Sequence, residues 1–367
     1  MAMLRSKDVL VTGASGLVGA RVLERLLSRH DDVHVHALVR RPAAWPNLAT
    51  RLGPAAARVT PVIGDVTHAG LGLDATTRQR LVARVRAIVH CAADTTFSRT
   101  LEQARAVNTE GTRNLLDLAS DWRVERIVHV STAFVAGART GLIREHELDA
   151  GAGFINGYEQ SKHEAEALVR GSSLPFVVLR PSTIVCDDGS GCVTQYNAVH
   201  RALRVFSAGL ASLMPGAEDT PVDVVTTSHV VAGVADIGFA ERALGGTFHL
   251  CAGQGSLGLG ELLDRAHAVW SRDAQWRRRG IMRPALTDLA TYRLFEQTVE
   301  ETGDVRLATI TRSLSHFVPQ LALPKQFDTT AADSVLGCSA LPVRSFWDAL
   351  LEHLADTRWG TLTQSAA

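Results

Sequence analysis

Short apolar runs rich in β-branched residues alternate with longer segments of helical periodicity through the first half of the chain. Runs of this length, bounded by glycine or polar residues, are typical of buried strands. The candidate strands are Asp8–Thr12, His34–Val39, Val59–Ile63, Ala87–Cys91, Arg126–Val130 and Phe176–Leu179.

The segments between these runs are candidate helices. Leu17–Ser28 carries apolar residues at helical spacing, and Thr109–Ser120 is a second example. Strand and helix alternate in this way as far as residue 180. The alternation predicts an α/β fold in which helices cover both faces of a parallel sheet.

The rhythm changes after Arg180-Pro181. Glycine-rich loops lead into a long helical stretch near Gln195–Leu213. The apolar run Val222–Val225 and the segment Thr247–Leu250 are candidate strands that rejoin the main sheet. We expect the remainder to be mainly helical, with breaks at prolines.

The chain has 367 residues, which is enough for a large α/β domain with a smaller one attached. We predict a sheet-containing domain over residues 1–185 and a smaller, mainly helical one over residues 186–360. Hydrophobic residues make up 46% and charged residues 21%, as in an ordinary soluble globular protein.

The charge and apolar patterns narrow the classes of partner. The formal net charge is zero, so no global field attracts nucleic acid or an anionic membrane surface. The sequence contains neither a signal-peptide pattern nor the run of about eighteen apolar residues that a membrane span needs. We expect a cytoplasmic protein. Five widely spaced cysteines, without a C-x-x-C pair, predict buried free thiols and no metal site.

A glycine triplet stands where the first strand gives way to the first helix. Gly13, Gly16 and Gly19 have the G-x-x-G-x-x-G spacing. Glycines there permit a tight turn and let backbone N–H groups approach a pyrophosphate at a helix N-terminus. We predict a dinucleotide site that uses Gly13, Ser15, Gly16, Leu17, Val18 and Gly19. A purely structural turn is the alternative.

The second strand ends in Arg40 and Arg41, where an NAD-selective site usually has an acidic residue. A guanidinium at this place pairs with a 2′-phosphate in bidentate fashion. The pattern therefore favours NADPH over NADH. Two arginines that only solvate a loop would give the same pattern.

Several further motifs follow the glycine loop in order along the chain: Gly64-Asp65-Val66-Thr67, His90-Cys91-Ala92-Ala93, Asn108-x-x-Gly111-Thr112, Val130-Ser131-Thr132, Tyr158-x-x-x-Lys162 and Arg180-Pro181. With these motifs, the chain resembles the extended short-chain dehydrogenase/reductase superfamily, over about residues 7–185. The resemblance implies a Rossmann-type doubly wound sheet, with a substrate-binding domain after it.

The resemblance also implies roles for individual residues. Thr132 stands at the position of the catalytic Ser/Thr, with Ser131 as the alternative, and Asn108 supports the active-site backbone or a water. The remaining implied cofactor contacts are Asp65 and Val66 at the adenine, Ala92 and Ala93 at the nicotinamide, and Lys162 and Pro181.

Tyr158 and Lys162 are the implied proton-donating pair. Residues four apart share one face of a helix, so both can point at the cofactor. A nearby ammonium lowers the pKa of a tyrosine, which brings proton donation to an alkoxide closer to neutral pH. Outside the context of the other motifs, such a pair is more often part of a helix surface.

The chain also carries softer motifs: Leu71-Gly72-Leu73, Ala92-Ala-Asp-Thr-Thr-Phe97, Ser131-Thr-Ala-Phe134, Pro221-Val-Asp-Val-Val225 and Phe248-His-Leu-Cys-Ala-Gly253. They resemble those of the branch that contains thioester reductase domains, carboxylic acid reductase termini and fatty acyl-CoA reductases. The branch implies reduction of an acyl group on coenzyme A or an acyl carrier protein to an aldehyde, or on to an alcohol.

Two further features bear on the substrate. Val193–Leu213 is either the wall of an acyl pocket or an ordinary packing helix. The run Trp276–Arg279, followed by Arg283, is either a docking surface for an acidic carrier or a solvated face. Competing functions are a carbonyl reductase or a sugar-nucleotide epimerase/dehydratase of the same fold, and a regulator that binds NADPH without turnover.

Overall fold

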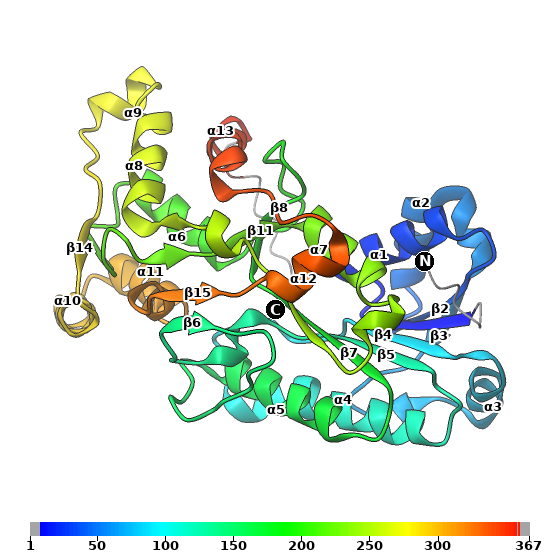
Figure 1. Ribbon diagram of the computed structural model, residues 1–367. Coiled ribbons are helices and arrows are strands. Elements are labelled where there is room, and N and C mark those ends of the chain that lie inside the picture. Colours follow the sequence, from blue (N-terminus) through cyan, green and yellow to red (C-terminus); the bar gives the residue numbers. More distant parts are fainter. Residues whose placement is uncertain (1–7, 358, 360–367) are drawn as a thin grey trace.

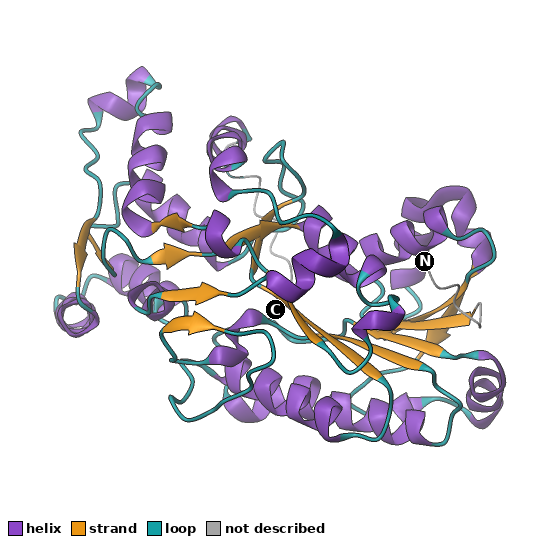
Figure 2. Ribbon diagram, viewed as in Figure 1, coloured by secondary structure: helices purple, strands orange, loops and turns teal. Residues whose placement is uncertain are grey.

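The computed structural model describes residues 8–357 and 359 (Figure 1). Residues 1–7, 358 and 360, which fall within the two predicted domains, lie outside the described part, as do residues 361–367. At the centre of the described part is a seven-stranded sheet (Figure 2), in the order β12-β7-β5-β4-β1-β2-β3. Its strands are β1 (Asp8–Thr12), β2 (His34–Val39), β3 (Val59–Ile63), β4 (Ala87–His90), β5 (Arg126–Val130), β7 (Phe176–Pro181) and β12 (Thr247–Leu250).

Neighbouring strands of this sheet are parallel throughout, and β1 and β4 are buried along their whole length. Burial on both faces is what their continuous apolar sequences require. Helices α4 and α5 cover one face, and α1 and α7 cover the other (Figure 1). These helices are α1 (Leu17–Arg29), α4 (Leu101–Ser120), α5 (Gly157–Gly171) and α7 (Thr227–Asp236). The predicted α/β doubly wound fold is confirmed.

The strand order reverses between β1 and β4, and this places the site. From β1 the chain proceeds outward to β2 and β3, whereas β4 leads outward to β5 and β7 in the opposite direction. Loops that leave the carboxyl ends at such a point diverge and leave a crevice. The glycine loop and the motifs after β2, β3, β4, β5 and β7 all lie at this edge of the sheet.

The remaining described helices flank the sheet or build the second half of the chain (Figure 1). The α-helices are α2 (Ala44–Leu52), α3 (Ala75–Arg84), α6 (Ala198–Ser207), α8 (Leu259–Trp270), α9 (Ala274–Arg278), α10 (Leu289–Glu301), α11 (Val305–Leu314), α12 (Thr330–Leu336) and α13 (Trp347–Asp356). The 3₁₀ helices are η1 (Gly53–Arg58), η2 (Ala69–Gly72), η3 (Ala133–Ala136), η4 (Glu241–Ala243), η5 (Gly253–Gly255), η6 (Val318–Ala322) and η7 (Val343–Ser345). None of the described helices is both long and apolar enough for a membrane crossing.

Short strand pairs connect these helices, and the second half is mainly helical, as predicted. Among the described residues they form four two-stranded sheets: β6 with β15, β8 with β11, β9 with β14, and β10 with β13. Their bounds are β6 (Gly141–Ile143), β8 (Thr183–Cys186), β9 (Leu213–Pro215), β10 (Pro221–Val222), β11 (Val224–Thr226), β13 (Leu257–Gly258), β14 (Ala285–Thr287) and β15 (Lys325–Phe327).

Of the two strands predicted to rejoin the main sheet, one prediction is confirmed and one is wrong. Thr247–Leu250 does pair with β7 as the edge strand β12. The run Val222–Val225 does not reach the sheet, because it is split at Asp223 and its halves pair with β13 and β8. The Asp223 carboxylate accepts the backbone N–H groups of Ala252 (2.9 Å) and Gly253 (2.8 Å), which fixes the strand beside the loop after β12.

The long helix expected at Gln195–Leu213 is also shorter than predicted. Helix α6 ends at Ser207 because Gly209 takes a left-handed conformation with φ +73°. The N–H of Leu210 bonds back to the carbonyl of Val205 at 3.0 Å, closing a glycine-terminated helix end. At the other helix, α4, the start lies earlier than Thr109, because Thr100 caps it at Leu101.

The division at residue 185 stays a prediction. Helix α7, which follows β11, packs on α1, and α12 packs on both α7 and β12. Parts of the second half therefore complete the layer that covers the sheet.

Candidate active site

Gly13 lies where a side chain has no room. Its φ is +66°, and an added Cβ would lie 2.7 Å from backbone atoms of both Cys91 and Ala92. At Gly19 an added Cβ would lie 2.2 Å from the Gly13 carbonyl oxygen. The loop is thus pressed against the end of β4, and helix α1 is pressed against the loop. Any residue larger than glycine at these two positions has to displace backbone.

The first turn of α1 fits the pyrophosphate of a dinucleotide. No described side chain caps Gly16, and the turn carries no acidic residue. Ser15 and Gly16 are exposed, and Leu17 and Val18 are half-buried; the Gly16 N–H already bonds to the Gly13 carbonyl at 2.9 Å, so the N–H groups offered to a ligand are those of its neighbours. Free N–H groups at a helix N-terminus, with the positive end of the helix dipole, bind phosphate. The residues of this cradle fit the pyrophosphate that NADH and NADPH share.

Arg40 and Arg41 follow β2 directly and are both exposed. Because β2 is parallel to β1, they stand at the same edge of the sheet as the glycine loop. Their position is compatible with the contact to a 2′-phosphate that the sequence suggests.

Asp65 and Val66 follow β3 and are held by a strained turn. The N–H of Asp65 bonds to the carbonyl of Leu71 at 2.9 Å, and Leu71 is a buried non-glycine residue with φ 58°. Such a conformation costs about 1–3 kcal/mol and persists where its surroundings determine it. Leu71 thus both packs and shapes the loop. Val66 is buried against Gly111, whereas Asp65 is half-exposed.

Helix α5 carries Tyr158 and Lys162 on one buried face, as the spacing predicts. The helix approaches α4 closely because it begins with Gly157, whose added Cβ would lie 2.9 Å from the Cα of Leu101. The Tyr158 hydroxyl is hydrogen-bonded to the side chain of Thr132. The Lys162 Nζ donates to the carbonyl of Val130, at the end of β5, at 2.9 Å.

The pKa values of this pair differ from the expectation. Burial raises the pKa of Tyr158 to about 12, although the Thr132 hydrogen bond opposes the rise. Burial lowers the pKa of Lys162 to about 8, opposed by the Glu166 carboxylate. The expected lowering of the Tyr158 pKa is therefore wrong for this structure: desolvation outweighs other effects, and the Lys162 ammonium is directed at Val130. Tyr158 is a neutral hydroxyl donor at pH 7.

The two candidates for the catalytic hydroxyl have different surroundings. Ser131 donates to the buried Glu166 carboxylate at 2.7 Å, so its hydroxyl is engaged in holding α5. Thr132 bonds to Tyr158, and its Oγ1 lies 3.4 Å from the carbonyl oxygen of Pro181 at the end of β7. The geometry brings Thr132, and not Ser131, to the tyrosine.

Asn108 ties the loop after β4 to helix α5. Its Oδ1 accepts the N–H of Asp94 at 2.8 Å, while its Nδ2 donates to the Asp94 carbonyl (3.0 Å) and to Ser161 (2.9 Å). Asn108 is buried in α4. It fixes the segment that contains Ala92 and Ala93 relative to the catalytic helix.

Three phenylalanines gather beside Tyr158, and sequence reasoning gave none of them a place in the site. The Phe97 ring centroid lies 5.2 Å from that of Tyr158, 6.3 Å from that of Phe134 and 6.2 Å from that of Phe317. Phe97 and Phe134 belong to motifs that the sequence singles out, so a signal existed. Phe317 comes from the segment after α11, and no local pattern marks it.

His90 and His129 lie near Lys162, with ring centroids 5.4 Å apart. Burial and the neighbouring Lys162 ammonium lower the pKa of His90 to about 3. Its ring instead joins Thr12 (2.7 Å) to Thr112 (3.1 Å). His90 is neutral and bound between strand and helix, which makes it a poor proton donor.

The family model described as "Male sterility protein", an NAD-binding domain, matches residues 11–234. The chain belongs to this family. The matched region contains the glycine loop, Thr132, Tyr158 and Lys162. The family assignment and the sheet identify an oxidoreductase of the extended short-chain dehydrogenase/reductase type.

Solved and curated relatives agree with the male sterility assignment. The terminal R domain from the myxalamid PKS-NRPS biosynthetic pathway superposes with a TM-score of 0.80 at 27% identity, covering 98% of this chain and 93% of that one. The isonitrile lipopeptide synthase of Streptomyces coeruleorubidus is 33% identical over 253 residues, 64% of this chain and 17% of its own length. The fatty acyl-CoA reductase wat of Drosophila melanogaster is 26% identical over 224 residues, 49% of this chain and 43% of its own. The match thus spans less than half of either curated relative.

The crowding at Gly13 gives the first prediction. Gly13→Ala should abolish measurable NADPH binding, because the new Cβ meets the end of β4. Gly53→Ala is the matched control, since Gly53 also has positive φ (+55°) but no described atom lies within 4 Å of its added Cβ. Binding is measured by quenching of protein fluorescence, and folding by thermal melting. Equal NADPH affinity in the two variants would contradict the cradle.

Proposed function

We propose that this chain is an NADPH-dependent reductase that converts an acyl thioester, on coenzyme A or an acyl carrier protein, to an aldehyde. The observation that carries the proposal is the pair of buried hydroxyls, Thr132 and Tyr158, bonded to each other beside an aromatic surface. The similarity to a terminal R domain and to a fatty acyl-CoA reductase supports the thioester over a ketone or a sugar nucleotide. A cytoplasmic location stays a prediction.

The residues divide the chemistry among them. When bound, NADPH supplies the hydride that adds to the thioester carbonyl carbon. Thr132 and Tyr158 donate hydrogen bonds to the carbonyl oxygen as it becomes negative, and Tyr158 transfers its proton to that oxygen. Lys162, with a pKa of about 8, remains largely protonated at pH 7, and its ammonium, held at the Val130 carbonyl, would bind the ribose hydroxyls of NADPH.

Collapse of the hemithioacetal completes the reaction. Its hydroxyl returns a proton to Tyr158 as the carbon–sulfur bond breaks, and the thiolate takes up a proton to leave as free thiol. The product is an aldehyde. A second hydride would give an alcohol, and the number of NADPH molecules consumed per thiol released measures whether this occurs.

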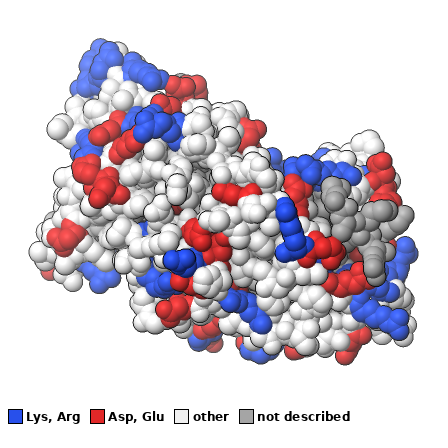
Figure 3. All heavy atoms as spheres, viewed as in Figure 1, with Lys and Arg blue, Asp and Glu red and all other residues white. Residues whose placement is uncertain are grey.

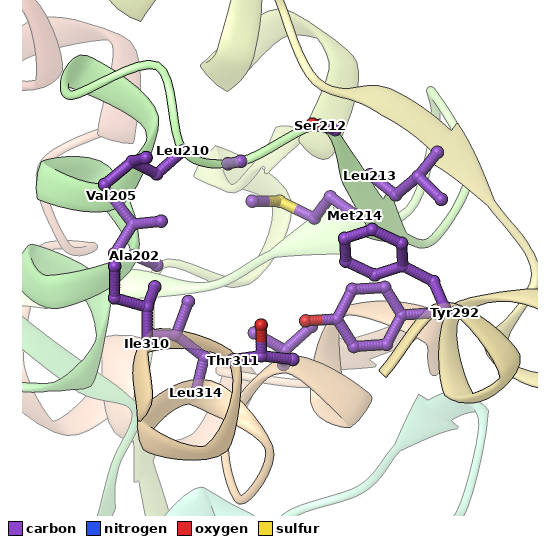
Figure 4. Close-up of a pocket in the computed structure, with 13 residues that line it drawn as sticks. Ala202, Val205, Leu210, Ser212, Leu213, Met214, Tyr292, Ile310, Thr311 and Leu314 are labelled. Atoms are coloured by element: carbon purple, nitrogen blue, oxygen red, sulfur yellow. The ribbon is translucent and has the colours of Figure 1, made fainter. Parts of the chain in front are cut away.

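A small pocket with room for about one water is lined mainly by apolar side chains (Figure 4). It lies between α6, β9, α10 and α11, and the Tyr292 ring projects toward Thr311 within it. Val318 also lines the pocket, and it adjoins Phe317 of the aromatic group. Of the stretch Val193–Leu213, only Ala202, Val205 and residues 210–213 line the pocket, while the buried face of α6 packs in the core. We propose that the acyl chain extends toward this pocket.

The basic surface over α9 is one candidate for contact with a carrier. Arg277, Arg278 and Arg279 are exposed at the tip of the molecule, where Figure 3 shows basic side chains together. Arg283 does not add to this surface, because it pairs with Glu218 (2.6 Å) and Asp264 (2.7 Å). Docking of a carrier there stays a prediction.

The thioester reaction has a direct test. Purified protein should oxidise NADPH when given acyl-CoA thioesters of medium or long chain, and free thiol should appear in step with NADPH loss. The assay follows absorbance of NADPH together with a thiol reagent over a series of chain lengths. Turnover of ketones without thiol release at any chain length would refute the proposed reaction.

Tyr158→Phe tests the proton donor. It should lower kcat by about 10²–10⁴-fold, the usual contribution of a general acid. The affinity for NADPH should stay within about twofold, because the cradle is unchanged and the ring still packs on Phe97. Steady-state kinetics and a fluorescence titration measure the two quantities. Near-normal turnover would show that another group donates the proton.

The arginines after β2 test cofactor choice. Arg40→Ala combined with Arg41→Ala should weaken NADPH binding about tenfold or more, as expected for lost charged hydrogen bonds, with little change for NADH. Arg277→Ala with Arg278→Ala is the control for loss of two exposed positive charges. If the affinity for NADH fell as much as the affinity for NADPH, Arg40 and Arg41 would have no specific role in binding the 2′-phosphate.

A further inference from the structure

A buried chain of polar groups joins the catalytic helix to the segment after α11. Lys325 of β15 donates from Nζ to Oε1 of Gln320 at 2.6 Å, and Nε2 of Gln320 donates to Oε1 of Glu159 in α5. Glu159, Gln320 and Lys325 are 0%, 8% and 5% exposed. The amide of Gln320 thus bridges a buried carboxylate and a buried ammonium.

Capping of α5 does not account for this chain. Asn156 caps the helix through the N–H of Glu159 (3.0 Å), and Glu159 accepts the N–H of Ile155 (3.0 Å) on its other oxygen. These local bonds would exist without Gln320 or Lys325. Asn156 also donates to the carbonyl of His316 at 3.2 Å, which adds a second link to the same distant segment.

The segment held in this way forms the apolar side of the site. Phe317 stacks on Phe97, which contacts the ring of Tyr158. Val318, the next residue, lines the pocket of Figure 4. Glu159 is the residue that follows Tyr158 in α5. One end of the polar chain is therefore the neighbour of the proton donor in α5, and Gln320 lies two residues after Val318 in the segment that lines the pocket.

The burial of these charges favours a positional role over a role in stability. Burial raises the pKa of Glu159 to about 7 and lowers that of Lys325 to about 8, and each charge opposes the shift of the other. Apolar residues of similar volume often replace a buried ion pair without loss of stability. The Gln320 amide satisfies both charges in one orientation only, with its oxygen at the Lys325 ammonium and its N–H at the Glu159 carboxylate. This orientation fixes where the segment lies against α5.

We propose that Glu159, Gln320 and Lys325 are positioning residues that hold residues 316–325 on the catalytic helix and thereby set the affinity of the site for its acyl thioester. The effect on affinity for an acyl thioester rests on the proposed function. The claim that these residues hold residues 316–325 on α5 is independent of that function.

Gln320→Met tests the proposal by keeping the length of the side chain and removing both hydrogen bonds. KM for the acyl-CoA with the lowest KM in the chain-length series should rise about tenfold, as for loss of hydrogen bonds to charged groups, with a smaller change in kcat. The affinity for NADPH should stay within about twofold. Thermal melting confirms that the variant is folded at the assay temperature.

Arg126→Met is the matched control for loss of a polar group from the interior. Arg126 is 5% exposed, like Lys325, and pairs with Glu241 at the amino end of β5, away from the site. This variant should lower the melting temperature and leave KM unchanged. An equal rise of KM in both variants, or an unchanged KM in Gln320→Met, would overturn the positioning role.

Gln320→Glu supplies an independent arm through pH. The groups that face the new carboxyl are Glu159 and Lys325, with Tyr158 and Asn156 next to Glu159. Near pH 6 a proton bound between the two carboxyls replaces the amide donor, so KM should approach the wild-type value. Near pH 8 the carboxyls ionise and repel each other, so KM should rise to the Gln320→Met value or above. A ratio of variant to wild-type KM that is constant over this range would contradict the bridging geometry.

Hydrogen exchange separates this proposal from the proposed reaction. Backbone amides of residues 316–327 and of the first turn of α5 should exchange faster in Gln320→Met than in the wild type, with β1 and β4 unchanged. If the wild type releases no thiol from any acyl-CoA, the reaction proposal fails and exchange alone decides the holding role. Unchanged exchange in residues 316–327 would overturn it.

Discussion

The geometry of the site depends on one buried carboxylate, that of Glu166. It accepts two hydrogen bonds from Arg180 of β7, at 2.9 and 2.6 Å, and one from Ser131 at the end of β5, at 2.7 Å. Loss of one partner from a buried pair of this kind costs about 3–5 kcal/mol. Lys162 and Tyr158 stand one and two helical turns before Glu166. The contact therefore sets the rotation of α5 over the sheet, and the same carboxylate helps to keep Lys162 charged.

The sequence predicts what local pattern encodes. All seven strands of the sheet, the glycine loop, the shared face of Tyr158 and Lys162, and the chain position of Thr132 follow from neighbours a few residues apart. Residues that meet only after folding escape this reasoning. Arg180 is visible as a motif, but its partner is not, and Phe317 and the Glu159–Gln320–Lys325 chain join segments separated by most of the second half.

The two errors in the second half have a common cause. An apolar run predicts that a segment is buried, but it does not identify the strand or helix that the segment contacts. Val224 and Val225 are buried as a strand should be, yet the bonds from Asp223 to the loop after β12 direct them away from the main sheet. In the same way, Gly209 stops α6 within a stretch whose apolar periodicity continues. A single residue with a specific backbone or side-chain demand overrode the average pattern in each case.

The place of β12 in the sheet constrains how the protein comes to be folded. β7 would be an edge strand with unpaired backbone groups until Thr247–Leu250 adds to it, and open edges of this kind invite pairing with other chains. During synthesis, β8 to β11, α6 and α7 leave the ribosome before β12 does. The last strand of the nucleotide-binding sheet therefore comes from beyond the predicted boundary at residue 185, and the edge of β7 stays open until that strand has been synthesised.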